Sequence, residues 1–229
     1  GDLTRAGFPF KKSIENIPNF VKEKFNLKNA NEFLSRNERS TNINSNNPNL
    51  RLVAEIVEPH YNLASIYIDQ GKLDLAEKEY IQTLSLRPGH SSAKIGLGSV
   101  YNKKGIFDKA EELYLQAIND GKSQNNIKSY PIAHLNLGEV YAKTGRIPLA
   151  IKEWEQAIHL NPSLLPAHFN LGTALMMKGK LDSAEKYFLN CLHINKNFKP
   201  ALFNLALLKQ KQMRWEESIS RFNNYIKIR

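Results

Sequence analysis

The chain has 229 residues, of which 41% are hydrophobic and 24% are charged. That composition is typical of an ordinary soluble protein with one large domain or two small ones. Lys and Arg outnumber Asp and Glu by 32 to 22, and the resulting charge of +10 attracts anionic partners without choosing among them. Because every apolar run is far shorter than the roughly 20 residues that span a bilayer, a transmembrane helix is excluded.

The start of the chain lacks the charged, apolar and small-residue regions of a secretory signal. It begins with Gly rather than Met, so we interpret it as a processed or excised fragment. Cytoplasm and periplasm both stay open as compartments. The single cysteine, Cys191, excludes an intramolecular disulfide and a cysteine-cluster metal site.

Residues 1–48 are predicted to form an N-terminal arm that is partly helical or disordered. Eleven of the first 50 residues are Asn, and the densest stretch, 41–49, is typical of a linker. Short helices are expected over 13–25 and 30–36, interrupted by Pro18 and by Asn-rich stretches.

Residues 49–229 contain five copies of one segment, which align without gaps from His60, Lys94, His134, His168 and Leu202. Successive copies start 34, 40, 34 and 34 residues apart, so one connection, near 121–129, carries six extra residues. Self-similarity at such a period is typical of a repeat architecture. The predicted repeats span about 57–90, 91–124, 131–164, 165–198 and 199–229.

Each copy is predicted to form two helices joined by a tight turn. Apolar residues recur at helical spacing in the first helix, as in Leu97 and Tyr101. In four copies a glycine follows, where a helix end favours positive φ: Gly71, Gly105, Gly145 and Gly179. The fifth copy has Met213 there, which predicts a different or strained turn. The second helix carries a small residue and, four positions later, an aromatic one, as in Ala110 and Tyr114.

This pattern resembles the tetratricopeptide repeat (TPR) family, whose Leu-Gly-x-x-Tyr, Ala and Phe positions are matched by Leu97, Gly98, Tyr101, Ala110 and Tyr114. The resemblance covers about residues 57–229 and departs from the family locally, where Leu175 and Lys209 replace Tyr. It implies an all-α fold: a right-handed α-solenoid of five helical hairpins, preceded by the arm. In a solenoid each hairpin stacks on its neighbours to bury a continuous core.

The sequence lacks the motifs of phosphate loops, dinucleotide sites, zinc proteases and serine hydrolases. His60, His134 and His168 share one repeat position, but equivalent residues of stacked hairpins are expected to lie too far apart for a common metal. We therefore predict no enzyme activity, no metal and no cofactor. Cys191 takes the position of Ala117 and is expected to be an inert buried thiol.

The family resemblance implies that residues beside the Leu-Gly position line a concave groove. Four copies have Asn immediately before that Leu: Asn62, Asn136, Asn170 and Asn204. A side-chain amide donates and accepts hydrogen bonds, as binding of a peptide main chain requires. The row resembles the asparagine ladder of the TPR superhelix in O-GlcNAc transferase. The alternative is that each Asn bonds the neighbouring repeat or a groove water. The second copy departs from the row, with Gly96.

One residue earlier stands an apolar row that includes Tyr61, Phe169 and Phe203. These side chains either accept hydrophobic residues of a bound peptide or belong to the core. The predicted peptide-binding set is completed by Ser65, Thr173 and Met176. No Lys or Arg occupies the first-helix groove positions of the first three copies, which argues against capture of an acidic chaperone tail.

Basic residues gather at the turns between the two helices of each copy. We call the following set the basic rim: Lys103, Lys104, Lys143, Arg146, Lys178, Lys180 and Lys211. Such a rim suits phosphates, acidic proteins or anionic membranes, although cations also complement helix C-termini. Because no aromatic interleaving or nucleic-acid motif accompanies the charge, nucleic acid is not the expected partner.

These observations favour a non-catalytic protein–protein interaction scaffold that binds an extended polypeptide segment in the groove. A second hypothesis is a self-assembling unit, in which the N-terminal arm occupies a groove and the uncapped last helix packs on a partner. That last helix carries Ile219, Phe222 and Ile226 at core spacing. A third hypothesis is an anionic-surface or nucleic-acid binder that uses the basic rim.

Overall fold

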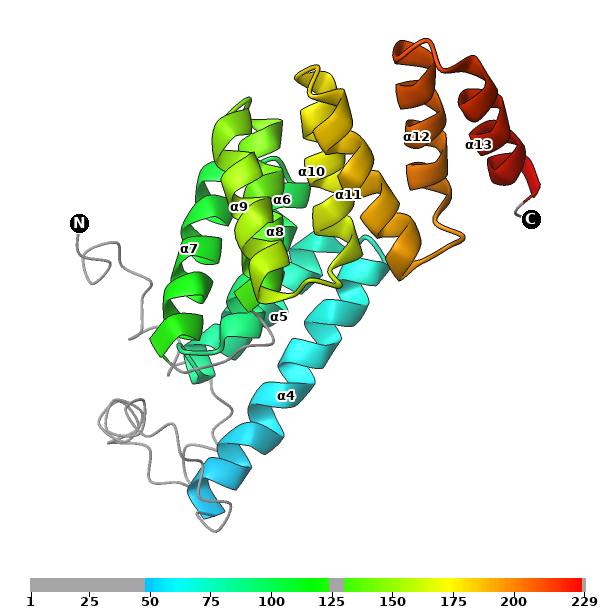
Figure 1. Ribbon diagram of the computed structural model, residues 1–229. Helices are drawn as coiled ribbons and strands as arrows, with labels where there is room; N and C mark the ends of the chain where they lie inside the picture. Colours follow the sequence, from blue (N-terminus) through cyan, green and yellow to red (C-terminus); the bar gives the residue numbers. More distant parts are fainter. Residues whose placement is uncertain (1–47, 124–129, 228–229) are drawn as a thin grey trace. The chain divides into compact units, whose positions relative to one another are not determined.

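The computed structural model describes residues 48–123 and 130–227, and nearly all of the predicted N-terminal arm lies outside them. These residues form α-helices and no strand, which confirms the all-α prediction (Figure 1). The helices are α4 (Pro48–Asp69), α5 (Leu73–Leu86), α6 (Ser91–Lys103), α7 (Phe107–Ser123), α8 (Tyr130–Lys143), α9 (Ile147–Leu160), α10 (Leu165–Met177), α11 (Leu181–Ile194), α12 (Lys199–Lys211) and α13 (Trp215–Lys227). None of them is both long and apolar enough to cross a membrane.

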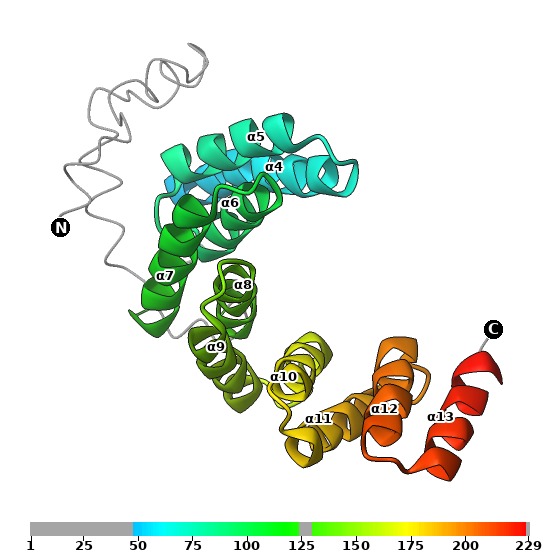
Figure 2. The ribbon, with the colours of Figure 1, turned by 90° about the horizontal axis from the view of Figure 1, so that it is seen from above.

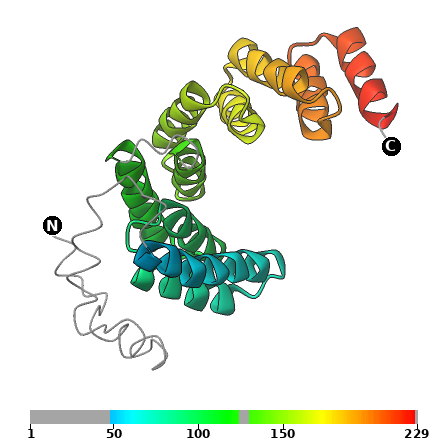
Figure 3. The ribbon, with the colours of Figure 1, turned by 90° about the horizontal axis from the view of Figure 1, so that it is seen from below.

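The chain divides into two compact units, residues 1–109 and 110–229. In the first unit α4 packs on α5 and α5 on α6, and Figure 3 shows α4 and α5 side by side. In the second unit α8 pairs with α9, α10 with α11 and α12 with α13, and the pairs join through α9–α10 and α11–α12. Figure 2 shows α8 and α10 along one side of this second unit and α9 and α11 along the other. The first and second helices of these two hairpins therefore form two layers.

The turn inside each hairpin uses left-handed backbone. The four turn glycines have φ between 71° and 76°, and Met213 in the fifth turn has φ 59°. The fifth turn also keeps the closing bonds of its glycine counterparts, from Arg214 N to Lys209 O at 2.9 Å and from Met213 N to Gln210 O at 3.0 Å. A residue with a Cβ pays roughly 1–2 kcal/mol for this conformation. The turn at Met213 is therefore strained, as the sequence predicted.

Small residues allow the aromatic residue of the second helix to fill the space inside each hairpin. Ala150 and Ala184 are fully buried, and so is Phe188. A Cβ on Gly138 would lie 2.5 Å from the Trp154 ring, and one on Gly172 would lie 2.9 Å from the Phe188 ring. The Gly of the Leu-Gly pair is needed in these repeats because an aromatic ring occupies the place of its side chain.

The faces at the two ends of the described helices are less covered than the faces between them. Ile66 on α4 is 50% exposed, whereas its equivalent Val100 on α6 is fully buried. Among the described helices none precedes α4 to cover that face. On α13, Ile219 is 61% exposed and Ile226 is 72% exposed. These apolar side chains have the spacing of a core face, but no described helix packs over them.

Candidate functional site

A hollow of about 510 Å³ opens in the second unit between α8, the first half of α9, and α10. We call it the α8/α10 hollow. Its volume lies within the range of roughly 300–1,000 Å³ that is usual for ligand sites. Most of the wall is apolar: Ala142, Ile147, Trp154, Phe169, Ala174 and Met177. The lining is completed by the polar residues Glu139, Lys143, Asn170, Thr173 and Lys178.

Ala142, which lines the hollow, is the smallest residue at its repeat position. The other four repeats carry larger residues at the corresponding position: Ile68, Asn102, Met176 and Gln210. The single methyl group of Ala142 occupies less space than any of those side chains. At this position the hollow therefore has a smaller lining residue than any other repeat would supply.

The aromatic walls of the hollow are held by the core behind them. The indole N–H of Trp154 donates to the Leu135 carbonyl at 3.2 Å, so its one polar group is already bonded. The Phe169 ring lies 5.4 Å from the Phe198 ring in a T-shaped contact and 6.0 Å from the Phe188 ring. Phe169 therefore belongs partly to the core, and it also lines the hollow.

Two residues of the asparagine row bond the preceding repeat. The Asn204 amide donates to the Thr173 hydroxyl at 3.4 Å, and the Asn170 side chain is hydrogen-bonded to Glu139. Thr173 and Glu139 occupy the same repeat position, so the two bonds are equivalent. An amide has two N–H donors and a carbonyl, so a single bond to a neighbouring repeat does not exhaust it. In the same row Asn136 is half-buried on α8.

In the first unit the predicted site residues gather around Tyr80. The Tyr61 ring lies 6.0 Å from the Tyr80 ring and stacks on His90 at 5.0 Å, and the Ser65 hydroxyl is 3.2 Å from the Tyr80 hydroxyl. A Cβ on Gly96 would overlap the Tyr80 ring. The row has Gly96 at this place because Tyr80 fills the space of a side chain. Asn62 is exposed on α4.

The last two predicted groove residues do not line the hollow. Phe203 is 41% exposed and contacts Phe222 and Tyr225, with ring centroids 5.8 Å and 5.7 Å away. Met176 is half-buried, and its neighbour Met177, which is 78% exposed, lines the hollow. The structure therefore brings Phe169, Asn170 and Thr173 together in the hollow, and Asn204 bonds Thr173 without lining the hollow itself.

Comparison with known families agrees with this architecture. Tetratricopeptide repeat models match residues 61–127 and 165–198, and a TPR repeat model matches residues 140–179. The chain belongs to the tetratricopeptide repeat family. Its fold is an all-α solenoid of TPR hairpins, as the sequence predicted. No curated protein sequence matches this TPR chain.

Solved TPR structures resemble the chain at low sequence identity. PilF of Pseudomonas aeruginosa has a TM-score of 0.68 and 19% identity, with 76% of this chain and 77% of PilF covered. MamA of Desulfovibrio magneticus RS-1 has a TM-score of 0.63 and 12% identity, with 75% and 94% covered. YrrB, a TPR protein described as having an unusual peptide-binding site, has a TM-score of 0.58 and 22% identity, with 77% and 92% covered. These similarities establish the fold.

The basic rim of this TPR chain contains cations in different environments. Lys104 bonds Asp74 and Glu77, both at 2.5 Å, and these bonds raise the pKa of Lys104 to about 12. Arg146 makes two bonds to the Glu111 carboxylate, at 2.6 Å and 3.2 Å. Among the remaining rim residues, Lys143 and Lys178 line the hollow. The other rim residues are exposed on the surface: Lys103, Lys180 and Lys211.

The repeat-position histidines each have a separate partner. His60 Nδ1 lies 2.5 Å from Glu79, and His134 Nδ1 lies 2.6 Å from Glu153. His168 Nε2 is 2.8 Å from the Pro162 carbonyl. These contacts join helices or loops of the same TPR hairpin or its neighbour, which is a structural role. Over the described residues, no group of three His, Cys, Asp or Glu has the arrangement of a metal site.

Cys191 is fully buried on α11, as its small-residue position predicted. Burial raises the pKa of its thiol to about 12. The thiolate, which is the nucleophilic form, is therefore suppressed at neutral pH.

Several residues of the hollow were missed by reasoning from sequence, among them Glu139 and Ala142. Glu139 is the one acidic residue at its repeat position, where the others are Ser65, Ser99, Thr173 and Leu207. Ala142 is likewise the smallest residue at its own position. Both the acidic residue and the small residue can be recognised in the sequence when the five repeats are compared position by position. Their shared place in one hollow became visible only with the packing of α8 against α10.

Proposed function

We propose that this TPR chain is a non-catalytic scaffold that binds an extended segment of another protein along the first helices of its hairpins. The proposal rests on the α8/α10 hollow, where apolar walls lie beside the amide of Asn170. Ligand sites in proteins combine mostly apolar walls with a few placed polar groups. A fold neighbour, YrrB, is described as having a peptide-binding site, which supports this use of the fold.

The asparagine row supplies the main-chain contacts in this proposal. Glu139 holds Asn170, and Thr173 holds Asn204, so the two amides are oriented before a ligand arrives. An amide held in this way loses little conformational entropy when it binds. Its remaining donor or acceptor bonds the peptide backbone, while the hollow accepts a side chain of the same segment.

The test begins with selection of peptides from a random display library on the 229-residue chain. Affinities of the selected peptides are then measured by fluorescence polarisation for the wild type and for the double variant N170A/N204A. We expect the double variant to lose about tenfold or more in affinity, equivalent to about 1.4 kcal/mol. A matched control is N223A/N224A, which removes two exposed asparagines of α13 and is expected to bind as the wild type does.

The proposal fails if no peptide is enriched over a scrambled pool. Unchanged affinity of N170A/N204A would remove the asparagine row from the binding site. Urea denaturation of each variant separates lost binding from lost folding, because both asparagines bond a neighbouring repeat.

A second candidate function is self-assembly, which the exposed apolar residues Ile219 and Ile226 of α13 favour. Light scattering of the wild type and of I219K/I226K measures it, because charges on that face would oppose packing against another apolar surface. An unchanged mass would dismiss this face as an assembly surface. The basic rim has less support as a polyanion site, since Lys104 and Arg146 already bond carboxylates of the chain.

A further inference from the structure

We propose that the α8/α10 hollow selects a bulky apolar side chain that is followed or preceded by an acidic residue in the bound segment. This inference rests on the proposed function and specifies the sequence that the scaffold recognises. The apolar residue would enter the hollow, and the acidic residue would lie at its edge, near Lys178.

The preference for an apolar side chain follows from the wall of the hollow, most of which is apolar. The Trp154 N–H is bonded to the Leu135 carbonyl, and the Thr173 hydroxyl donates to the Phe169 carbonyl at 2.9 Å. A polar ligand side chain would lose its hydration there without gaining an equivalent partner. An apolar side chain loses no hydrogen bond on entering, so it is favoured.

The preference for an adjacent acidic residue follows from the charges of the lining. It contains two cations, Lys143 and Lys178, and one carboxylate, Glu139. The Glu139 carboxylate is already bonded by Asn170 and interacts with Lys143, so it balances only one of the two cations. The positive excess at the hollow therefore attracts a carboxylate of the partner, and it disfavours a lysine or arginine.

Lys178 is the cation best placed to meet that carboxylate. It is exposed and directly follows the end of α10, whereas Lys143 also interacts electrostatically with Glu139. A partner carboxylate near Lys178 would gain a charge-assisted hydrogen bond. Specificity in this arrangement comes from two neighbouring features, the open space beside Ala142 and the charge of Lys178.

The experiment starts from the enriched peptides of the display selection, whose aligned sequences should show a large apolar residue beside Asp or Glu. Polarisation titrations then compare the best peptide with versions in which the apolar residue becomes Ser or the acidic residue becomes Gln. Each version is titrated against the wild type, A142M, M177S, K178E and K180E. A142M copies the residue of the fourth repeat, Met176, into the hollow. K180E is the matched control, because Lys180 is exposed and does not line the hollow.

We expect A142M and M177S to weaken the best peptide by about tenfold, with little effect on the Ser version, which has no bulky group to place. We expect K178E to weaken the acidic peptide about threefold to tenfold and to leave the Gln version nearly unchanged, while K180E behaves as the wild type does. M177S tests the hollow even if A142M disturbs packing, because Met177 is 78% exposed.

Several outcomes overturn the inference. Enriched peptides without a common apolar residue, or with Lys or Arg in place of the acid, would contradict the selectivity while leaving the scaffold function standing. Equal effects of K178E and K180E would reduce the acidic preference to the general positive charge of the chain. Failure of the proposed function looks different, because no peptide would then be enriched at all.

Discussion

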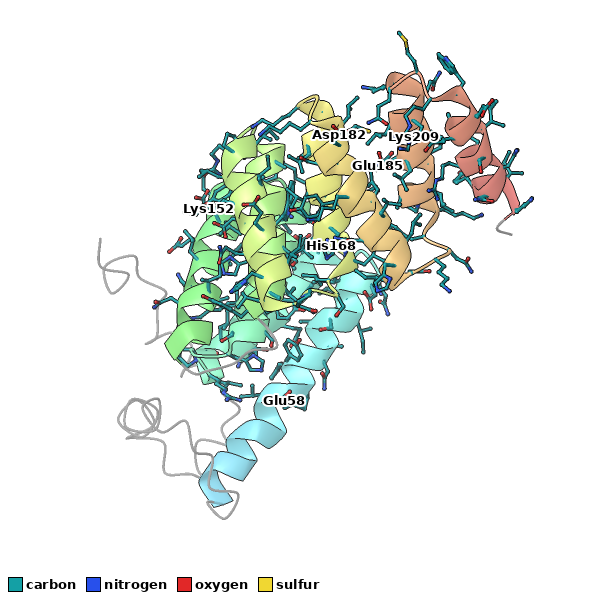
Figure 4. All side chains as sticks on the ribbon, in the orientation of Figure 1. Glu58, Lys152, His168, Asp182, Glu185 and Lys209 are labelled. Atoms are coloured by element: carbon teal, nitrogen blue, oxygen red, sulfur yellow. The ribbon has the colours of Figure 1, made fainter. Side chains whose placement is uncertain are left out.

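Lys209 donates a hydrogen bond of 2.5 Å to Glu185 of the preceding repeat, from a position where the first three repeats have tyrosine. Figure 4 labels the two side chains, on α12 and α11. Only 1% of Lys209 is exposed. In the second repeat Tyr101 holds the same position and donates to Glu77 of the first repeat at 2.9 Å. The buried ammonium of Lys209 therefore bonds the Glu that a tyrosine hydroxyl bonds at the equivalent position of the second repeat.

The position of Lys209 and that of Glu185 in the preceding repeat change together along the chain. We call the two residues that meet in this way at each junction an interface pair. Tyr141 of the third repeat is bonded to Glu111 of the second. In the fourth repeat the position carries Leu175, and the third repeat has Ile151 where the first, second and fourth have Glu. Each interface pair is thus polar on both sides or apolar on both sides.

Removing the ammonium should destabilise the fold. In K209M the Glu185 carboxylate would lose its closest cation, and we expect the free energy of unfolding to fall by about 3 kcal/mol. Chemical denaturation measures the change. K209Y should lose less, because tyrosine keeps a donor for Glu185. The double variant K209L/E185I copies the Leu175 and Ile151 pair and should recover most of the loss. If the double variant is no more stable than K209M, the interface pair is not a matched unit.

Replacing Met213 by Gly should stabilise the protein. Met213 is 78% exposed, so little packing is lost, and its φ of 59° carries the cost of a left-handed residue with a Cβ. We expect M213G to gain about 1 kcal/mol in the free energy of unfolding, read from the urea midpoint. The reverse substitution, G179M, should lose a similar amount. A destabilised M213G would show that the Met213 side chain contributes contacts that outweigh the strain.

Gly96 should not tolerate a side chain. In an exposed helix, Gly to Ala gains about 1 kcal/mol, but here the Cβ would overlap the ring of Tyr80, which is almost fully buried. We therefore expect G96A to lose about 1–3 kcal/mol. A cycle with Y80L checks the cause, since G96A should be much less harmful once the ring is gone. Equal losses in both backgrounds would rule out the overlap as the reason.

Stability should decline in alkaline solution. Burial raises the pKa of the Cys191 thiol from 9.0 to about 12 and, as the largest cause, raises that of the Tyr101 phenol from 10.0 to about 12. Between the ordinary pKa and the raised pKa of each group, the folded state holds a proton that the unfolded state releases. The stability that these two groups contribute is therefore fully present below pH 9 and is lost as the pH rises toward 12. Urea midpoints at pH 8, 9 and 10 measure the decline. C191A, which has the Ala of the second and third repeats, should show a shallower decline.

The repeat period allowed the helical hairpins and their turns to be predicted, because both depend on spacing along the chain. The strain at Met213 was predicted for the same reason, since the position of the residue alone determines the φ that it must adopt. The pairing of Arg146 with Glu111 was not predicted, because these residues lie 35 positions apart and meet only when hairpins stack. The role of Lys209 was also missed for this reason.

The candidate site was predicted in part. Phe169 and Asn170 were recognised by their column in the repeats, and both line the hollow. The hollow itself is lined by the small side chain of Ala142 and by the Trp154 ring. Its volume depends on how the helices pack in three dimensions, which the repeat period does not give. The absence of Asn at Gly96 was noticed in the sequence, but its cause, the Tyr80 ring, lies in another helix.

The interface pairs have a consequence for how a gene of this kind can change. An in-frame deletion of residues 165–198 would remove one whole repeat and keep the period, yet it would bring Lys209 against Ile151, so the buried ammonium would lose Glu185, its closest carboxylate. Loss of residues 131–164 would similarly set Leu175 against Glu111. The repeats share a shape, but they are not interchangeable. Recombination between them would be filtered by the chemistry of each junction, so the order of the copies is inherited together with their number.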